Sequence, residues 1–259
     1  KLPSQARVVV VGGGVIGTSI AYHLAKLGCN DVVLLERDQL TSGTTWHAAG
    51  LITGAGLADE TLLWAQQFTR RLYETLEAET GLATGFKRIG HLHLACDATR
   101  RECQRREMNF CRSQGVEKFE VGPREIQDLF PLINTDGVLS AIYTPSDGRA
   151  NPVDVTMSLA KGARLQGVQI FEGVPVTDFL LKDHRIAGVA TAQGTVHADV
   201  VVLAAGMWSR QLGAKVGVSV PLQAAEHYYL LTEPIAGVHN RLPVVEDPAT
   251  YTYVREEGG

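Results

Sequence analysis

Cysteine is scarce in this chain, with four in 259 residues. No two of them form a CxxC pair, so neither a disulfide framework nor a cysteine metal site is indicated. We therefore expect free thiols in a reducing compartment, and a protein that is not secreted. No apolar run approaches the ~18 residues that a membrane span needs. The four cysteines are Cys29, Cys96, Cys103 and Cys111.

Charge of one sign is not in excess either. The sequence has 24 Lys and Arg against 28 Asp and Glu, a formal net charge of −4, and 45% of its residues are hydrophobic. The charge balance excludes a basic nucleic-acid surface. The hydrophobic fraction is too high for a disordered chain. The length allows one large domain or two small ones with an ample core.

The first forty residues have the pattern of a βαβ unit. A β-branched run at 7–11 precedes three glycines, helical spacing covers 15–27, and a second apolar run covers 32–36. Such a unit predicts parallel strands joined by a right-handed crossover. Further helices are expected at 60–79, 98–114, 123–130, 152–166 and from 207, and further strands at 89–95, 138–144, 168–171, 176–181, 186–191, 195–197, 200–206, 225–232 and 250–255.

These elements predict an α/β fold with two layers, each discontinuous in sequence. A Rossmann-like nucleotide-binding layer is expected from 1–85 and 146–215. An inserted α+β layer, largely antiparallel and facing the substrate, is expected from 86–145 and 216–259. The last residues, 256–259, have the composition of the middle of a hairpin, so we expect the fold to be truncated at its C-terminus.

The glycines between the first strand and helix fit the G-x-G-x-x-G pattern for dinucleotide binding. Gly12 permits the tight turn, Gly14 lets a diphosphate approach the backbone, and Gly17 allows the helix to pack closely on the strand. Val15 and Ile16 place backbone N–H groups at the helix N-terminus, where negative charge is favoured. The motif alone is weak, but its place between a strand and a helix strengthens it.

Glu36 lies at the end of the second strand, where an acid accepts a hydrogen bond from a ribose hydroxyl. An acid there disfavours a 2′-phosphate, and the adjacent Arg37 does not overturn this. The ligand is therefore FAD or NAD rather than NADP. The alternative is a tight turn with a solvated glutamate.

A loop at 38–56 is rich in Gly, Ser and Thr, and such length without regular structure is uncommon in a compact domain. Its small residues allow a backbone to run close to a flat ligand, which favours a flavin. His47 stands between Trp46 and two alanines. From composition alone, His47 has either a functional role or a buried structural one.

The string from Arg37 to Gly50, RDQLTSGTTWHAAG, resembles the dimethylglycine/sarcosine dehydrogenase group of D-amino-acid-oxidase-like flavoproteins. The resemblance covers most of the chain and includes 77–85, 147–152, 204–209 and 226–232. It implies a glutathione-reductase-like fold and FAD attached covalently through His47 to the flavin 8α-methyl group. Attachment there requires a neutral imidazole, which histidine offers near neutral pH.

The same resemblance implies a wider set of cofactor-binding residues. The segment 204–209 is expected to contact the flavin, although it could simply pack a helix on the sheet edge. Val176 matches a position whose backbone serves the adenine. Besides the motif residues and His47, the set comprises Arg37, Thr44, Thr45, Ala49, Gly50, Leu51, Val176, Ala205, Gly206 and Trp208.

His227 and Tyr253 match active-site positions of the family. We expect His227 to tune the protonation of a substrate amine and Tyr253 to orient it, since only the unprotonated amine loses hydride readily. The alternative is that these side chains pack a sheet. His91 and His93 would share a strand face, but no spacing of further ligands supports a metal site.

The resemblance implies an FAD-dependent amine dehydrogenase or oxidase acting on CH–NH bonds. Its substrate would be dimethylglycine or sarcosine, oxidised by hydride transfer to flavin N5. It implies an electron-transfer flavoprotein and folate as partners, the latter through a C-terminal part absent from this sequence, and no nucleic acid or membrane. The expected compartment is the mitochondrial matrix in a eukaryote or the cytoplasm in a bacterium.

A second hypothesis is a non-catalytic regulatory subunit. The strings LPSQA at 2–6 and EHYYLLT at 226–232 also resemble the regulatory subunit of pyruvate dehydrogenase phosphatase. That subunit departs from the Trp46–His47 pair, which is intact here. The pair therefore favours the enzyme.

Overall fold

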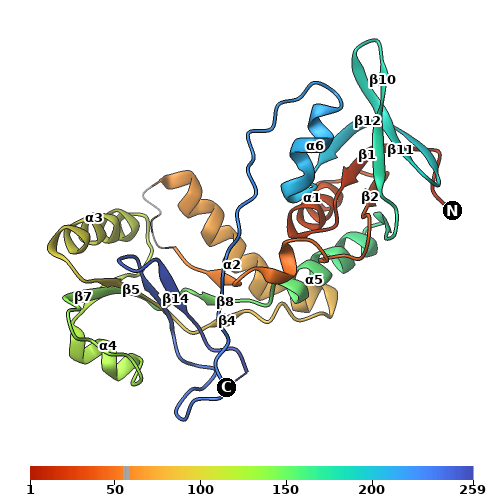
Figure 1. Cartoon of the computed structure of the whole chain (residues 1–259). Helices are drawn as coiled ribbons and strands as arrows, with labels where there is room; N and C mark the ends of the chain where they lie inside the picture. Colours follow the sequence, from red (N-terminus) through yellow and green to blue (C-terminus); the bar gives the residue numbers. More distant parts are fainter. Residues whose placement is uncertain (55, 57–58, 259) are drawn as a thin grey trace. The chain divides into compact units, whose positions relative to one another are not determined.

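The computed structural model describes residues 1–54, 56 and 59–258 (Figure 1). Gly259, the last residue of the expected hairpin, lies outside this part. The chain divides into two compact units. Unit 1 comprises Lys1–Ala49, Thr75–Thr84 and Asn151–His227, and unit 2 comprises Gly50–Glu74, Gly85–Ala150 and Tyr228–Gly259.

Unit 1 is built on a six-stranded sheet with the order β10-β11-β12-β1-β2-β9. Strands β12, β1, β2 and β9 are parallel neighbours, and β10 and β11 extend the sheet as an antiparallel hairpin. The expected parallel βαβ start is confirmed. The strands are β1 (Gln5–Val11), β2 (Val32–Leu35), β9 (Gln169–Phe171), β10 (Val176–Lys182), β11 (Arg185–Thr191) and β12 (Gly194–Leu203).

Two helices of unit 1 begin and end where their sequence indicates. Helix α1 (Val15–Lys26) stops before Gly28, whose φ of 82° is the left-handed conformation that glycine tolerates. Helix α5 (Pro152–Leu165) starts with proline, and the Asn151 side chain accepts from the first-turn N–H groups. The helix expected from 207 is a 3₁₀ turn, η2 (Gly206–Trp208), followed by α6 (Ser209–Ala214).

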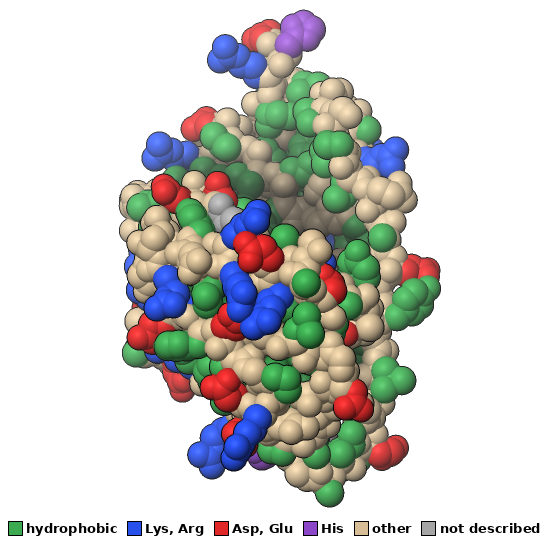
Figure 2. Space-filling model, turned by 90° about the vertical axis from the view of Figure 1, so that its left-hand side faces the viewer, with side chains coloured by type: hydrophobic (Ala, Val, Ile, Leu, Met, Phe, Trp, Pro, Cys, Tyr) green, Lys and Arg blue, Asp and Glu red, His purple; other side chains and the backbone are tan. Residues whose placement is uncertain are grey.

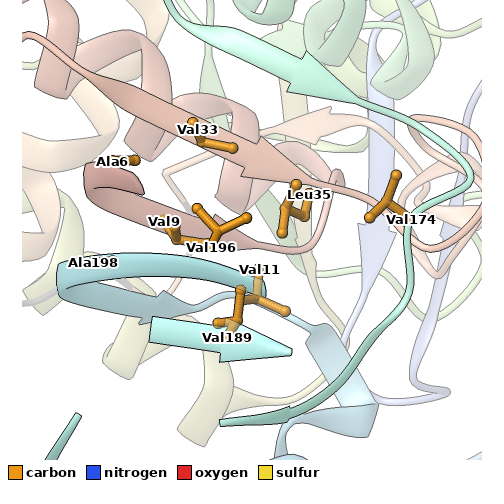
Figure 3. Packing of buried hydrophobic residues seen from close by; sticks show 9 residues of the cluster. All are labelled: Ala6, Val9, Val11, Val33, Leu35, Val174, Val189, Val196 and Ala198. Atoms are coloured by element: carbon orange, nitrogen blue, oxygen red, sulfur yellow. The ribbon is translucent and has the colours of Figure 1, made fainter. Parts of the chain in front are cut away.

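The core of unit 1 is made mainly of β-branched side chains from its strands (Figure 3). Parallel strands covered on both faces favour continuous apolar runs, and the Val8–Val11 run of β1 is buried throughout. This core holds the ends of β1 and β2 in place, where the glycine turn and Glu36 lie. Its buried members are Ala6, Val9, Val11, Val33, Leu35, Val174, Val189, Val196 and Ala198.

Unit 2 contains a five-stranded sheet with the order β14-β13-β5-β7-β6, and a small three-stranded sheet, β3-β8-β4. The larger sheet is antiparallel except where β13 pairs with β5, so the largely antiparallel second layer is confirmed. The strands are β3 (Leu51–Ile52), β4 (Lys87–Arg88), β5 (His91–Ala95), β6 (Phe119–Val121), β7 (Ser140–Thr144), β8 (Gly148–Arg149), β13 (Val244–Asp247) and β14 (Thr252–Val254).

Helices α3 (Ala98–Ser113) and α4 (Pro123–Leu129) belong to unit 2, whereas α2 (Glu60–Thr80) contributes residues to both units. The buried apolar side chains of the larger sheet include Leu92, Leu94 and Val245, packed with Ile126 of α4. One face of this sheet therefore forms the core of unit 2. The other face carries the polar residues described below.

Two strand predictions were wrong. The segment 225–232 has no regular structure, and its Tyr228 and Leu230 are exposed; although its sequence alternates, no described strand pairs with it. The strands expected at 195–197 and 200–206 are one strand that ends at Leu203. It stays continuous because Ala198 keeps its pairing with Ala6 of β1.

The surface shows no concentration of one charge on the face seen in Figure 2, where basic and acidic side chains are interspersed. Within residues 1–54, 56 and 59–258, no helix is both long enough and apolar enough to cross a membrane.

Candidate functional site

Two glycines of the motif have no room for a side chain: Gly12 in the turn between β1 and α1, and Gly17 in the first turn of α1. Gly12 has a φ of 114°, and a Cβ built there would overlap the carbonyl oxygen of Ala204 and lie 3.1 Å from Cα of Ala205. A Cβ on Gly17 would overlap the carbonyl oxygen of Gly12. Gly12 and Gly17 are therefore required by the close packing of the backbone here, independently of any ligand.

The N-terminus of α1 is suited to an anion. Its first turn contains no acidic residue, and its N-cap, Gly14, has no side chain. The N–H of Val15 donates to Oγ1 of Thr45 at 3.1 Å. No acceptor for the N–H groups of Ile16 and Gly17 is found in the described part of the chain. These N–H groups and the helix dipole favour negative charge at this point.

The carboxylate of Glu36 is fixed against the glycine turn. Only 8% of the residue is exposed. Its Oε2 accepts from the N–H of Gly13 at 2.6 Å, and its Oε1 accepts from the N–H of Asp38 at 2.9 Å. A carboxylate has about four acceptor positions, so capacity for a ligand hydroxyl remains.

The segment that leads into β10 lies beside Glu36. The backbone carbonyl of Glu36 accepts from the N–H of Val174 at 2.8 Å, and that of Asp38 accepts from the N–H of Gly173. Two residues further on, Val176 packs partly buried against the core of unit 1. Val176, the position expected to serve the adenine, is thus in the same unit as Glu36 and follows by two residues a residue bonded to it.

The loop after β2 is tied onto the glycine turn at two points. The N–H of Thr41 donates to the carbonyl oxygen of Gly13 at 3.1 Å, and Thr45 accepts from Val15 as described. A Cβ built on Gly14 would lie 2.9 Å from Oγ1 of Thr45, closer than real Cβ contacts. The absence of a side chain at Gly14 therefore lets this loop approach the helix N-terminus.

His47 ends a short 3₁₀ turn, η1 (Thr45–His47), and its side chain is exposed. Its ring centroid lies 3.6 Å from that of Trp46, at an interplanar angle of 34°. The buried structural alternative for His47 therefore does not hold. Ala49 is the last residue of this stretch in unit 1, and Gly50 and Leu51 begin unit 2.

The segment after β12 contacts the same loop. Cζ of Arg37 lies 3.8 Å from the ring centroid of Trp208, a cation–π arrangement. A Cβ built on Gly43 would lie 3.4 Å from the Trp208 ring, and Oγ1 of Thr44 lies 3.9 Å from Sδ of Met207. Two cofactor-binding segments predicted from distant parts of the sequence are thus side by side in unit 1.

The two residues expected at the substrate are placed in different units. His227 is the last residue of unit 1 and is exposed in the irregular segment. Tyr253 is 40% exposed on β14 of unit 2, directly opposite Glu246 of β13. Their expected functions remain predictions.

Unit 2 contains a buried polar network that the sequence reasoning missed. Asp147 is fully buried and accepts from the N–H of Gly54 and from Nη1 of Arg70, both at 2.8 Å, and from Nε2 of Gln66 at 3.2 Å. Burial raises the pKa of Asp147 above its ordinary value. The only sequence signal was the resemblance that begins at Asp147.

His91 extends this network toward β13. Its Nδ1 lies 3.8 Å from Oδ2 of Asp147, and its Nε2 lies 3.3 Å from Oε2 of Glu246. His93 stacks beside it with ring centroids 5.9 Å apart, as expected for two residues on one strand face. Among the described residues, no group of three or more His, Cys, Asp or Glu is arranged to hold a metal ion.

The sequence also matches a known protein family over nearly its whole length. The family of FAD dependent oxidoreductases called DAO matches residues 7–259. The chain belongs to this family. The glycine turn, the free first-turn N–H groups of α1 and the fixed carboxylate of Glu36 fit the diphosphate and ribose of FAD.

Curated relatives are considerably longer than this DAO chain. It is 43% identical over 258 residues to 4-methylaminobutanoate oxidase (formaldehyde-forming) of Paenarthrobacter nicotinovorans, covering 100% of this chain and 31% of the relative. It is 40% identical over 264 residues to human mitochondrial sarcosine dehydrogenase, covering 99% and 28%. It is 36% identical over 262 residues to the mouse mitochondrial pyruvate dehydrogenase phosphatase regulatory subunit, covering 100% and 30%. The chain thus spans less than a third of each relative.

A solved structure supports the fold. L-proline dehydrogenase from P. horikoshii matches with a TM-score of 0.86 and 26% identity, covering 99% of this chain and 68% of that one. The flavoprotein fold expected from the sequence is therefore confirmed.

Proposed function

We propose that this DAO chain is part of an oxidoreductase that oxidises an N-methylated glycine-type secondary or tertiary amine, such as sarcosine or dimethylglycine. The observation that carries the proposal is the glycine turn with Glu36 hydrogen-bonded across it, in a chain 40% identical to a sarcosine dehydrogenase. FAD supplies the hydride acceptor, and the protein supplies binding and orientation.

The residues of unit 1 would hold FAD at several points. The N–H groups of Ile16 and Gly17 would donate to the diphosphate, because no described residue competes for them. Glu36 would accept from a ribose hydroxyl while keeping its bond to Gly13. The remaining proposed contacts come from Gly12, Gly14, Val15, Arg37, Thr44, Thr45, Ala49, Val176, Ala205, Gly206 and Trp208, and from Gly50 and Leu51.

Covalent attachment is proposed at His47. The support is that its imidazole is exposed at the end of η1 rather than buried in the core. The new bond replaces an 8α C–H and an imidazole N–H, and the two electrons released leave through the flavin's own electron acceptor. Such a tether tends to raise the flavin potential, which favours hydride withdrawal from a C–N bond.

Amine oxidation requires the substrate nitrogen to be unprotonated when hydride leaves its N-methyl carbon. We assign His227 to this protonation equilibrium and Tyr253 to orientation of the amine. The resulting iminium adds water and releases formaldehyde, or passes its one-carbon unit to a folate. An electron-transfer flavoprotein is proposed as the acceptor of the electrons, in the mitochondrial matrix or the bacterial cytoplasm.

The experiment is anaerobic addition of amines to the purified holoenzyme while the visible flavin absorption is recorded. Sarcosine, dimethylglycine or 4-methylaminobutanoate should bleach it. Glycine betaine should not bleach it. Its quaternary nitrogen has no lone pair to form the iminium as hydride leaves the N-methyl carbon. Bleaching by none of the three amines would contradict the proposal.

The regulatory-subunit alternative is favoured by one observation, the 36% identity to the phosphatase regulatory subunit. It predicts flavin that stays oxidised with every amine. The same titration therefore separates the two functions.

A further inference from the structure

One face of the larger sheet in unit 2 carries a row of ionisable side chains. Glu246 of β13 is paired with His93 of β5 on one side and with Tyr253 of β14 on the other. Residues directly opposite each other on neighbouring strands point to the same face. His91, two residues before His93, shares that face as well.

The row runs from the interior of unit 2 to its surface. His91 is 1% exposed and His93 is 8% exposed, whereas the Glu246 side chain is 34% exposed and Tyr253 is 40% exposed. The carboxylate of Glu246 thus lies where the buried histidines give way to the exposed tyrosine.

One oxygen of Glu246 contacts the buried histidine His91. Its Oε2 lies 3.3 Å from Nε2 of His91, whose Nδ1 faces Asp147 at 3.8 Å. Asp147 is itself fixed by Arg70 through a 2.8 Å contact. A chain of ion-pair contacts thus runs from Arg70 through Asp147 and His91 to this oxygen of Glu246.

The other oxygen of Glu246 is available. Its Oε1 has no hydrogen-bond or ion-pair partner in the described part of the chain. The charged and titratable groups that act on this carboxylate are His91, His93 and Arg100 of α3. The close contact with His91 is the main cause that lowers the pKa of Glu246, so the group is an anion at neutral pH.

We propose that Glu246 binds the cationic nitrogen of the amine substrate beside Tyr253, with His91 as the residue that positions the carboxylate. This rests on the proposed function and names the part of the substrate that unit 2 recognises. Amines are mostly protonated in neutral solution, so an oriented anion captures the abundant form. The bound amine must then lose its proton before hydride leaves.

Two ligands of the same shape, one with a cationic nitrogen and one without, show whether binding depends on the positive charge. Glycine betaine carries a trimethylammonium group, and 3,3-dimethylbutanoate replaces its nitrogen with a neutral carbon. Neither is oxidised, so their equilibrium binding to the holoenzyme is measured calorimetrically without turnover. We expect betaine to bind about tenfold more tightly, equivalent to ~1.4 kcal/mol.

The decisive variant is Glu246→Gln, which keeps the size of the side chain and removes its charge. It should abolish the preference for betaine, and should raise KM for dimethylglycine by ~10–100-fold with kcat little changed. His91→Asn should weaken the preference, and the double variant should lose no more than Glu246→Gln alone. Glu117→Gln, an exposed glutamate of unit 2, is the matched control.

No preference in the wild type, or a preference that survives Glu246→Gln, would overturn the inference. Should Glu246→Gln not fold, Glu246→Asp answers the same question, because a shorter carboxylate must weaken the preference. The binding measurement does not depend on turnover. Failure of the wild type to bleach with any amine would count against the proposed function alone.

Discussion

The carboxylate of Glu36 accepts a 2.6 Å hydrogen bond from the backbone N–H of Gly13, and so joins the end of β2 to the turn between β1 and α1. A residue expected only to meet a ribose thus also shapes the turn that is proposed to bind the diphosphate. A second bond, from the N–H of Asp38, directs the carboxylate further. We therefore expect the binding of the two halves of a dinucleotide to be coupled through this one side chain.

Glu36→Gln should weaken FAD binding by about tenfold or more, because a hydrogen bond to a charged group is worth ~1.5–3 kcal/mol. The amide has a single oxygen and cannot accept at both positions. The measurement is the Kd of FAD from flavin fluorescence, in a His47→Ala background so that binding stays reversible. Glu117→Gln in that background is the control, and an unchanged Kd for Glu36→Gln would refute the coupling.

Gly17→Ala should destabilise unit 1 by ~2–4 kcal/mol, because the added Cβ overlaps the carbonyl oxygen of Gly12 and α1 must move away from β1. Gly28→Ala is the control. It meets nothing within 4 Å and carries only the strain of a φ of 82°, about 1 kcal/mol. Urea denaturation measures both, and equal losses would show that close helix packing is not what requires Gly17.

Glu120 should give a pH-dependent contribution to the stability of unit 2. Its hydrogen bonds with Arg105 and Arg101 of α3 lower its pKa from 4.5 to about 2. A lowered pKa in the folded state means that the stabilisation is present above pH 4.5 and is lost as the pH falls toward 2.

Glu120→Gln should therefore cost up to ~1 kcal/mol at pH 7, the range of partly exposed pairs, and less at pH 3. Urea midpoints at the two pH values give the difference, with Glu117→Gln as the matched variant. A loss at pH 3 as large as at pH 7 would show that the ion pairs are not its cause.

Local patterns explain why much of unit 1 could be predicted. The strand, glycine turn and helix around Gly12 are contiguous, and each has its own propensity and cap. The same applies to α5, which begins after Asn151 with a proline. These elements need no distant partner to be recognised, so their bounds agreed with the structure within a few residues.

Long-range pairing explains the failures. The alternating segment 225–232 has β-propensity but no partner strand among the described ones, and propensity alone does not make a strand. Strand β13, in contrast, lies between Pro243 and Pro248 and shows no alternation. It forms because β5, about 150 residues earlier, offers an edge on which Val244 pairs with His91.

In the candidate site, too, residues in local patterns could be predicted and residues brought together by long-range contacts could not. Gly12 and Glu36 lie at the ends of the two strands of one βαβ unit, and a sequence motif predicted them. His47, in the loop that follows, was singled out by the family resemblance. The network of Arg70, His91 and Asp147 combines α2, β5 and a turn, and no spacing rule connects them. His227 and Tyr253 rest on resemblance, and their functions stay predictions.

The most direct test of the account is the intact mass of the denatured holoenzyme, compared with that of His47→Ala. The wild-type polypeptide should carry the added mass of one FAD after acid precipitation. The variant should show the bare polypeptide mass and release its flavin into the supernatant. A bare wild-type mass, or flavin that stays attached to His47→Ala, would contradict the assignment of His47.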